Sequence, residues 1–270
     1  MSRWSCVVAA CALGCHGTPA APTPPQAIIA QEPIQAARGG YIAAVAGCNV
    51  CHVRGGGPLH APNITPDPAT GIGTWNDQQV VAAVRQGIRP DGMRLSPMMP
   101  YPFYHGMTDD DLHALVIWLR TQPPRRDRVA RRAFALAPIV LPAALDNVDP
   151  ASDREGHGRY LVGLMHCAGC HGADFSGGQR FGDVVAPNIT SDPETGIGKW
   201  TEDDIIRAIR EMKDPEGHRL RRPMADYRAS WAKVTDMDLD AVATFIQSIP
   251  AVRHEIPSDH EHPPSVSTRP

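Results

Sequence analysis

The stretch Cys-Asn-Val-Cys-His at residues 48–52 recurs as Cys-Ala-Gly-Cys-His at residues 167–171. A C-x-x-C-H run is the attachment signature of a c-type haem. Two cysteines on one helical turn can each form a thioether with a vinyl group of the porphyrin, and the next histidine can bind the iron. The sequence therefore predicts two haem c groups, one held by Cys48, Cys51 and His52 and the other by Cys167, Cys170 and His171.

A C-x-x-C pair also occurs in zinc sites and in proteins that exchange disulfides. Neither alternative explains a histidine directly after the second cysteine in both copies. A zinc site would also need two further ligands nearby. We therefore favour haem over both alternatives.

The two motifs belong to a longer internal duplication. Tyr41 and Cys48 match Tyr160 and Cys167 at one constant offset, and the second copy then carries six extra residues within 172–185. Beyond them, the loop at 61–75 matches the loop at 186–200, with the shared pattern APNIT followed by TGIGxW. In a chain of 270 residues this repeat predicts a first domain at 34–124, a linker at 125–152, a second domain at 153–250 and a polar tail at 251–270.

Each domain is predicted to be helical, so the fold class is all-α: two tandem domains, each wrapped around one covalently bound haem. A first helix is expected at about 33–47 and 153–166, leading into each haem motif. Capping residues followed by acidic first turns predict that a second helix begins at Asn76 or Thr201 and a third at Thr108 or Thr235. The apolar stripe of the third helix is expected to be core; it comprises Leu112, Leu115, Val116 and Leu119, and then Leu239, Val242, Phe245 and Ile246.

The second axial ligand of each iron is predicted to be a methionine. Met99 aligns with Met224, and both lie in Pro-rich segments between the second and third helices. Met98 remains an alternative at the first site, because it follows a proline as Met224 does. A thioether ligand raises the haem potential relative to a second imidazole. His60, His105, His113 and His218 have no counterpart in the other copy, and we interpret them as surface or loop histidines.

The first 33 residues are predicted to be an export signal and a Pro-rich tether. Arg3 precedes a short run of small and apolar residues at 6–14, and a Pro/Ala/Thr-rich segment follows. Attachment of haem c in bacteria takes place outside the cytoplasm, so a periplasmic location is expected. Cleavage before Cys15, or less favourably before Cys11, would leave a lipid-bearing cysteine and a single membrane anchor.

Two other interpretations of this leader remain. It could be a plain cleaved signal with incidental cysteines, or Cys11, Cys15 and His16 could form a spaced-out haem motif, which is disfavoured because no folded segment would cover that haem. No other apolar run in the sequence is long enough to span a bilayer.

Charge excludes one class of partner and suggests another. The net charge of −3 gives no case for nucleic-acid binding. Arg219, Arg221 and Arg222 precede Met224, whereas the first site is more apolar, so one hypothesis is that the second haem faces an acidic partner. Ordinary solvated arginines are at least as good an interpretation. The arginine cluster at 125–132 could contact anionic lipid near the tether, but a solvated linker is the favoured interpretation.

The chain resembles the bacterial dihaem cytochromes c, a group that includes the cytochrome subunits of membrane-bound alcohol, gluconate and sorbitol dehydrogenases. The resemblance is carried by the two C-x-x-C-H motifs, the Pro-Asn-Ile-Thr loops and the Met-Pro-Tyr segment, over about residues 35–250. Those subunits usually have three such domains and a membrane-associating tail, whereas this sequence shows two domains and a polar tail.

The resemblance implies further roles in the loops. The carbonyls of Pro62 and Pro187 would orient His52 and His171. Trp75 and Trp200 would either reach a haem propionate through the indole N–H or serve only as core. The Asn-Ile-Thr triplets also read as glycosylation sequons, but the repeated loop explains them better.

The function expected from these features is the transfer of single electrons between a donor, such as a dehydrogenase, and a cytochrome or oxidase acceptor. The protein itself would perform no substrate chemistry. The alternative is a dihaem peroxidase-type enzyme, which needs an open iron position with acid and base groups above it. Because both units offer a methionine, the carrier is favoured.

Overall fold

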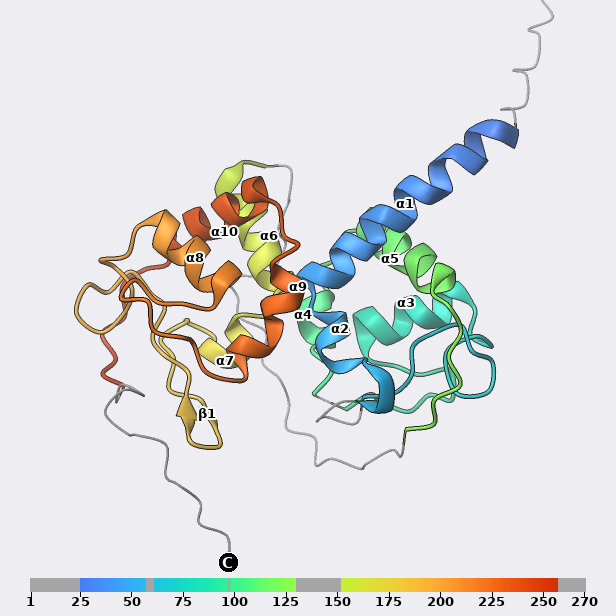
Figure 1. Cartoon of the computed structure of the whole chain (residues 1–270), viewed down its shortest axis with the longest axis horizontal. Coiled ribbons are helices and arrows are strands. Elements are labelled where there is room, and N and C mark those ends of the chain that lie inside the picture. Colours follow the sequence, from blue (N-terminus) through green and yellow to red (C-terminus); the bar gives the residue numbers. More distant parts are fainter. Residues whose placement is uncertain (1–24, 57–60, 97, 130–151, 257–270) are drawn as a thin grey trace, which may run out of the picture.

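The computed structural model describes residues 25–56, 61–96, 98–129 and 152–256 (Figure 1). The expected export signal with Cys15, residue His60, and most of the expected linker and tail lie outside the described residues. Among the helices that are described, none combines the length and the apolarity needed to cross a membrane.

The first domain consists of helices and loops. Its elements are α1 (Pro25–Val45), α2 (Cys48–Cys51), the 3-10 turn η1 (Arg54–Gly56), α3 (Asp77–Gln86), α4 (Tyr101–Tyr104) and α5 (Asp109–Thr121). Helix α1 begins at Pro25 and continues through Pro33, so the expected helix start at about residue 33 was wrong. Proline favours the first turn of a helix, but Pro33 lies inside α1. The preceding Ala, Ile and Gln residues are tolerated in a helix, and α1 extends over them.

The second domain repeats this order. Its elements are α6 (Arg154–Leu164), α7 (Ala168–His171), β1 (Arg180–Phe181), β2 (Val184–Val185), α8 (Glu202–Glu211), η3 (Met224–Tyr227), α9 (Arg228–Trp231) and α10 (Asp236–Ser248). The six extra residues of this copy belong to the segment that forms the antiparallel β1–β2 hairpin. The fold is otherwise helical, as the sequence predicts.

Local sequence signals account for the second and third helices. The side chain of Asn76 accepts a hydrogen bond from the backbone N–H of Gln79, and Thr201 accepts one from Asp204, each within a reciprocal capping box. Thr108 and Thr235 cap α5 and α10 in the same way. Each such cap stabilises its helix by about 1 kcal/mol. All eight residues of the expected apolar stripes are buried, which confirms that prediction.

Two glycines allow the first and last helices of each domain to cross closely. Helix α1 packs on α5, and α6 packs on α10. A Cβ atom on Gly39 or on Gly158 would lie 1.9 Å from the carbonyl oxygen of Ala114 or Ala241, respectively. Only glycine permits this separation, so the crossing that positions each haem motif depends on these two residues.

The two domains share one hydrophobic core. Figure 1 shows them side by side, with α4 and α9 at the junction. Helix α4 contacts α6 of the other domain, and α9 contacts α1. Buried residues of both domains, including Tyr104, Tyr160 and Trp231, belong to a single cluster. The two domains therefore pack against each other and are not independent units.

Residues just after the third helices form hydrogen bonds with the loops of their own domains. The Nδ2 atom of Asn63 donates to the carbonyl of Arg125 at 2.6 Å, and the backbone N–H of Asp127 donates to Thr70 at 2.9 Å. In the second domain, Asn188 donates to the carbonyl of Val252 at 2.8 Å. These segments follow a terminating helix and carry no periodic pattern, so only the tertiary contacts reveal them.

Candidate functional site

Both C-x-x-C-H motifs form one turn of helix. The backbone N–H of His52 donates to the carbonyl of Cys48 at 3.0 Å, and that of His171 donates to Cys167 at 2.9 Å. The four cysteines are free thiols. Burial raises the pKa of Cys48 and of Cys167 to about 12 and that of Cys170 to about 11. A disulfide-exchange pair needs a lowered thiol pKa, so these values argue against that alternative.

The two histidines are held by the residues that the family resemblance indicated. Nδ1 of His52 lies 2.8 Å from the carbonyl oxygen of Pro62, and Nδ1 of His171 lies 2.9 Å from that of Pro187. A carbonyl can only accept, so Nδ1 carries the proton and Nε2 keeps its lone pair. Burial lowers the pKa of both imidazoles, and the proline carbonyl offsets part of that shift. Each ring is thus neutral, oriented and able to bind a metal through Nε2.

A repeated network of asparagine and threonine side chains holds each proline carbonyl in place. Oδ1 of Asn188 accepts from the N–H of Thr190 at 3.0 Å and from its hydroxyl at 2.7 Å, while Nδ2 donates to Thr195 at 3.1 Å. Asn63 makes the same bonds to Thr65 and Thr70. Asn188 and Thr190 are 2% and 0% exposed. Sequence reasoning assigned these residues to the repeated loop but missed this role, which the match of Asn and Thr in both copies could have indicated.

The methionines lie between the second and third helices, as expected. Met99 and Met224 are partly buried and pack against the core. Met98, the alternative at the first site, is 50% exposed. Burial therefore favours Met99 over Met98. The two domains repeat the same donor set: two thiols on one helical turn, an imidazole with an open Nε2, and a half-buried thioether. These side chains fit a haem c, which needs two thioether links and one or two axial ligands.

The sequence model of the family described as Cytochrome c matches residues 36–123 and 157–250. The chain belongs to the cytochrome c family. The match occurs twice, once over each domain, and it confirms the expectation of two haem c groups.

Several curated proteins are similar to this cytochrome. The fructose dehydrogenase cytochrome subunit of Gluconobacter japonicus is 31% identical over 86% of this chain and 56% of its own length. The cytochrome c subunit of the quinone alcohol dehydrogenase of Gluconobacter oxydans is 31% identical over 80% of this chain and 55% of its own length. A diheme cytochrome c-type protein of Cereibacter sphaeroides is 28% identical over 81% of this chain and 87% of its own length. The chain thus spans about half the length of the first two relatives, and these matches support an electron-transfer cytochrome.

The tryptophans of the repeated loops pack against the core of the cytochrome. Trp75 and Trp200 are both partly buried. Their carbonyls accept hydrogen bonds from Arg120 at 2.6 Å and from Gln247 at 3.1 Å. Neither indole N–H has a hydrogen-bond partner among the described residues. Both interpretations of the tryptophans, core packing and a contact with a propionate, are therefore compatible with the structure.

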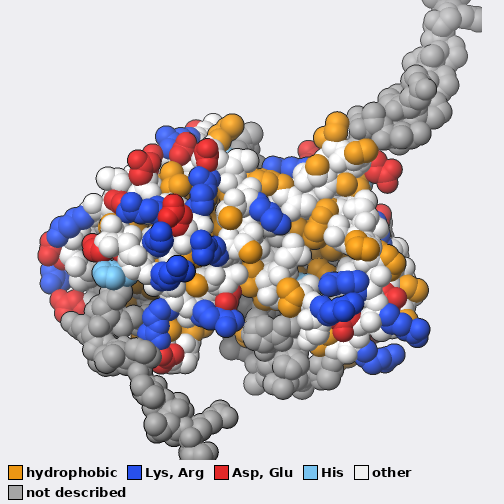
Figure 2. Space-filling view, in the orientation of Figure 1, with side chains coloured by type: hydrophobic (Ala, Val, Ile, Leu, Met, Phe, Trp, Pro, Cys, Tyr) orange, Lys and Arg blue, Asp and Glu red, His pale blue; other side chains and the backbone are white. Residues whose placement is uncertain are grey.

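Two of the arginines near Met224 are already paired within their own domain. Arg221 forms an ion pair with Asp183, and Arg222 forms one with Asp226 at 2.6 Å. Figure 2 shows Lys and Arg side chains gathered on the second domain, at the left of the view, among acidic side chains. Hydrophobic side chains are more frequent on the first domain in this view. The positive charge near the second haem is therefore smaller than the sequence alone suggests.

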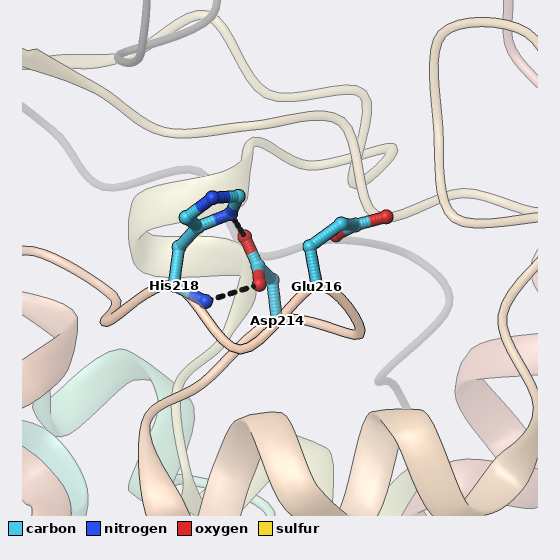
Figure 3. Close-up of side chains that lie close together, drawn as sticks. All are labelled: Asp214, Glu216 and His218. Atoms are coloured by element: carbon cyan, nitrogen blue, oxygen red, sulfur yellow. Dashed lines mark hydrogen bonds and ion pairs between the residues drawn. The ribbon is translucent and has the colours of Figure 1, made fainter.

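Of the histidines that lack a counterpart, His105, His113 and His218 lie among the described residues. His105 and His113 are exposed, and His218 lies on a loop, where its backbone N–H and its Nδ1 approach the carboxylate of Asp214 at 2.7 and 2.9 Å (Figure 3). Asp214, Glu216 and His218 form the one group of three or more possible metal ligands of the Asp, Glu, His and Cys types among the described residues.

Proposed function

We propose that this cytochrome carries single electrons from an extracytoplasmic dehydrogenase to a cytochrome or oxidase acceptor. The observation that supports the proposal most directly is the repeated donor set. In both domains, an oriented imidazole and a half-buried methionine recur at equivalent positions, and this repeat supports one pair of axial ligands for each haem. Two ligands that stay bound leave no open position for a substrate, which is the arrangement of a carrier rather than an oxidising enzyme.

The residues have the following proposed roles. Cys48, Cys51, Cys167 and Cys170 form the thioether links. His52 and Met99 bind the first iron, and His171 and Met224 bind the second. Pro62 and Pro187 orient the histidines through Nδ1, which would leave each Nε2 available to bind the iron. The haem, when bound, supplies an iron that alternates between ferric and ferrous. A methionine as second ligand would raise the haem potential relative to a second imidazole.

The partner proposal rests on the relatives. Proteins named as cytochrome subunits of fructose and alcohol dehydrogenases share about 30% identity with this chain over most of its length. A dehydrogenase is therefore the proposed donor, with the chain as a subunit that performs no substrate chemistry. The proposed location is the periplasm, with a lipid on Cys15 as the proposed anchor.

An optical redox titration of the haem-loaded protein tests the carrier proposal. We expect two low-spin haems, a thioether-to-ferric-iron charge-transfer band, and no change when carbon monoxide is added to the reduced form. A haem that binds carbon monoxide readily would contradict the proposal and favour the dihaem peroxidase alternative, because that reaction needs an open iron position.

The proposed acidic partner at the second haem needs its own test. Charge at the rim of an interface acts mainly on the association rate and its salt dependence. We expect Arg221→Gln combined with Arg222→Gln to weaken the salt dependence of reduction by an acidic redox protein. The combined variant Arg85→Gln and Arg89→Gln, in the first domain, is the control. An unchanged salt dependence would show that these arginines only pair with Asp183 and Asp226.

A further inference from the structure

The position directly before each haem motif differs between the domains. Gly47 precedes Cys48, and the equivalent residue before Cys167 is His166. Both residues adopt the left-handed conformation, with φ of 69° and 46°. Glycine occupies this region without cost, whereas a histidine there is strained by about 1 kcal/mol or more. A strained histidine in place of glycine indicates that its side chain has a role.

The imidazole of His166 lies among aromatic rings from both domains. Its ring centroid is 5.4 Å from that of Tyr227, 6.3 Å from Phe103 and 6.4 Å from Tyr104. Nε2 of His166 lies 3.4 Å from the hydroxyl of Tyr227. Trp231 stacks on Tyr227 with centroids 4.5 Å apart. We call these five side chains the aromatic bridge.

In each domain, a ring of the aromatic bridge contacts the haem motif of the other domain. Tyr227, from the second domain, lies so close to Gly47 that a Cβ atom there would be 2.6 Å from its Cε1. Phe103, from the first domain, lies against Gly169 inside the second motif, where a Cβ would be 3.4 Å from its Cε2. The indole N–H of Trp231 donates to the carbonyl of Val45 at 3.1 Å, just before the first motif. The bridge therefore contacts both motifs.

The electrostatic neighbours of Tyr227 agree with this placement. Burial raises the pKa of its hydroxyl, and the thiols of Cys51, in the first motif, and of Cys170, in the second, raise it further. In the haem-bound protein these sulfurs are thioethers without charge, so their effect on the pKa disappears. Their proximity to one ring remains, and it places Tyr227 between the two attachment points.

We propose that the two haems exchange electrons within the chain across the aromatic bridge formed by Phe103, Tyr104, His166, Tyr227 and Trp231. The proposal rests on the carrier function proposed above. In each exchange, one ferrous iron becomes ferric and the other ferric iron becomes ferrous, and no proton or bond is transferred. The rings are not oxidised. They fill the space between the two motifs with packed atoms, and tunnelling through packed atoms is faster than across a void or water.

The test uses the haem-loaded protein with one electron per molecule. Exchange NMR of the haem methyl signals measures how fast the electron moves between the two haems. For the parent protein we expect a rate that does not depend on protein concentration. Exchange that is proportional to concentration would overturn the proposal, because the electron would then move between molecules.

Two variants interrupt the aromatic bridge. His166→Gly installs the residue that the first domain has at a left-handed position, and Tyr227→Leu removes the central ring. Each variant is expected to lower the intramolecular rate by about tenfold, because contacts across the gap are lost. Tyr101→Leu is the control, since this tyrosine packs on Gly87 of its own domain, and it should leave the rate unchanged.

Pulsed EPR of the oxidised protein measures the distance between the irons and separates a lost path from moved domains. A slower rate at an unchanged distance supports the proposal, and a rate within about twofold of the parent overturns it. If Tyr227→Leu changes the distance between the irons, the rate measured for His166→Gly decides the test. Glycine at residue 166 relieves the backbone strain there. If the parent protein does not bind carbon monoxide but shows no intramolecular exchange, this inference is wrong and the proposed carrier function stands.

Discussion

The hydroxyl of Tyr41 donates a hydrogen bond to the carboxylate of Asp238 in the other domain. The equivalent Tyr160 donates to Asp111 at 2.7 Å, so the exchange is reciprocal. Each aspartate is also held within its own domain, Asp111 by Arg38 at 2.7 Å and Asp238 by His157 at 2.7 Å. Burial and the neighbouring carboxylate raise the pKa of both phenols, which therefore keep their protons and act as donors. This pair of contacts fixes the domains, and hence the two haem motifs, relative to one another.

The interdomain tyrosines should contribute measurably to stability. Tyr41→Phe and Tyr160→Phe each remove a hydrogen bond to a buried carboxylate, so we expect each to lower the free energy of unfolding by about 2 kcal/mol. Guanidinium unfolding of the haem-loaded protein measures the change. Tyr101→Phe is the matched control and should have little effect. If all three variants behaved alike, the interdomain bonds would be dispensable.

The two methionines at the first site should respond differently to truncation. Met99 packs against the core, whereas Met98 is half exposed. Met99→Ala is expected to abolish the thioether charge-transfer band of one haem and to allow carbon monoxide to bind it. Met98→Ala should leave both properties unchanged. The opposite pattern would assign the first iron to Met98.

Truncation of the two asparagines of the proline loops, Asn188 and Asn63, should lower the free energy of unfolding by different amounts, because the two side chains differ in burial. Asn188→Ala leaves the groups around a 2% exposed side chain without partners, so we expect a loss of about 3 kcal/mol in the free energy of unfolding. Asn63 makes the same bonds but is only half buried, so Asn63→Ala should cost less. Chemical denaturation of the two haem-loaded variants measures both losses. Equal losses would show that burial does not set the cost.

Acid should weaken the fold through His166. Burial lowers the pKa of its imidazole from 6.5 to about 4. Between these values the unfolded chain binds more protons than the folded one, so stability falls as the pH falls through this window. From pH 7 to pH 5 this histidine should lower the free energy of unfolding by about 2 kcal/mol.

The His166→Gly variant isolates that contribution. Its stability should fall less between pH 7 and pH 5 than that of the parent, by the same amount of about 2 kcal/mol. His113→Gln, at an exposed position on α5, is the control and should keep the pH dependence of the parent. Identical slopes for parent and His166→Gly would show that the imidazole titrates normally in the folded protein.

The sequence by itself determined the number of domains, the haem motifs and most helices. These features are local: a C-x-x-C-H turn, a capping threonine before acidic residues, or a stripe repeated in two copies can be recognised without knowing what lies nearby. The same locality explains the correct expectation that Leu112 and Leu239 are core.

Only the tertiary structure decided how the domains meet. The contact of Tyr41 with Asp238 joins residues 197 positions apart, and no periodic pattern marks either one. His166 looks like an ordinary residue before a motif until its left-handed backbone and its three neighbouring rings are seen. Pairing between distant side chains depends on the close crossing at Gly39 and Gly158 and on the packing of the whole core. Those long-range steric conditions are properties of the folded chain, and no short stretch of the sequence specifies them.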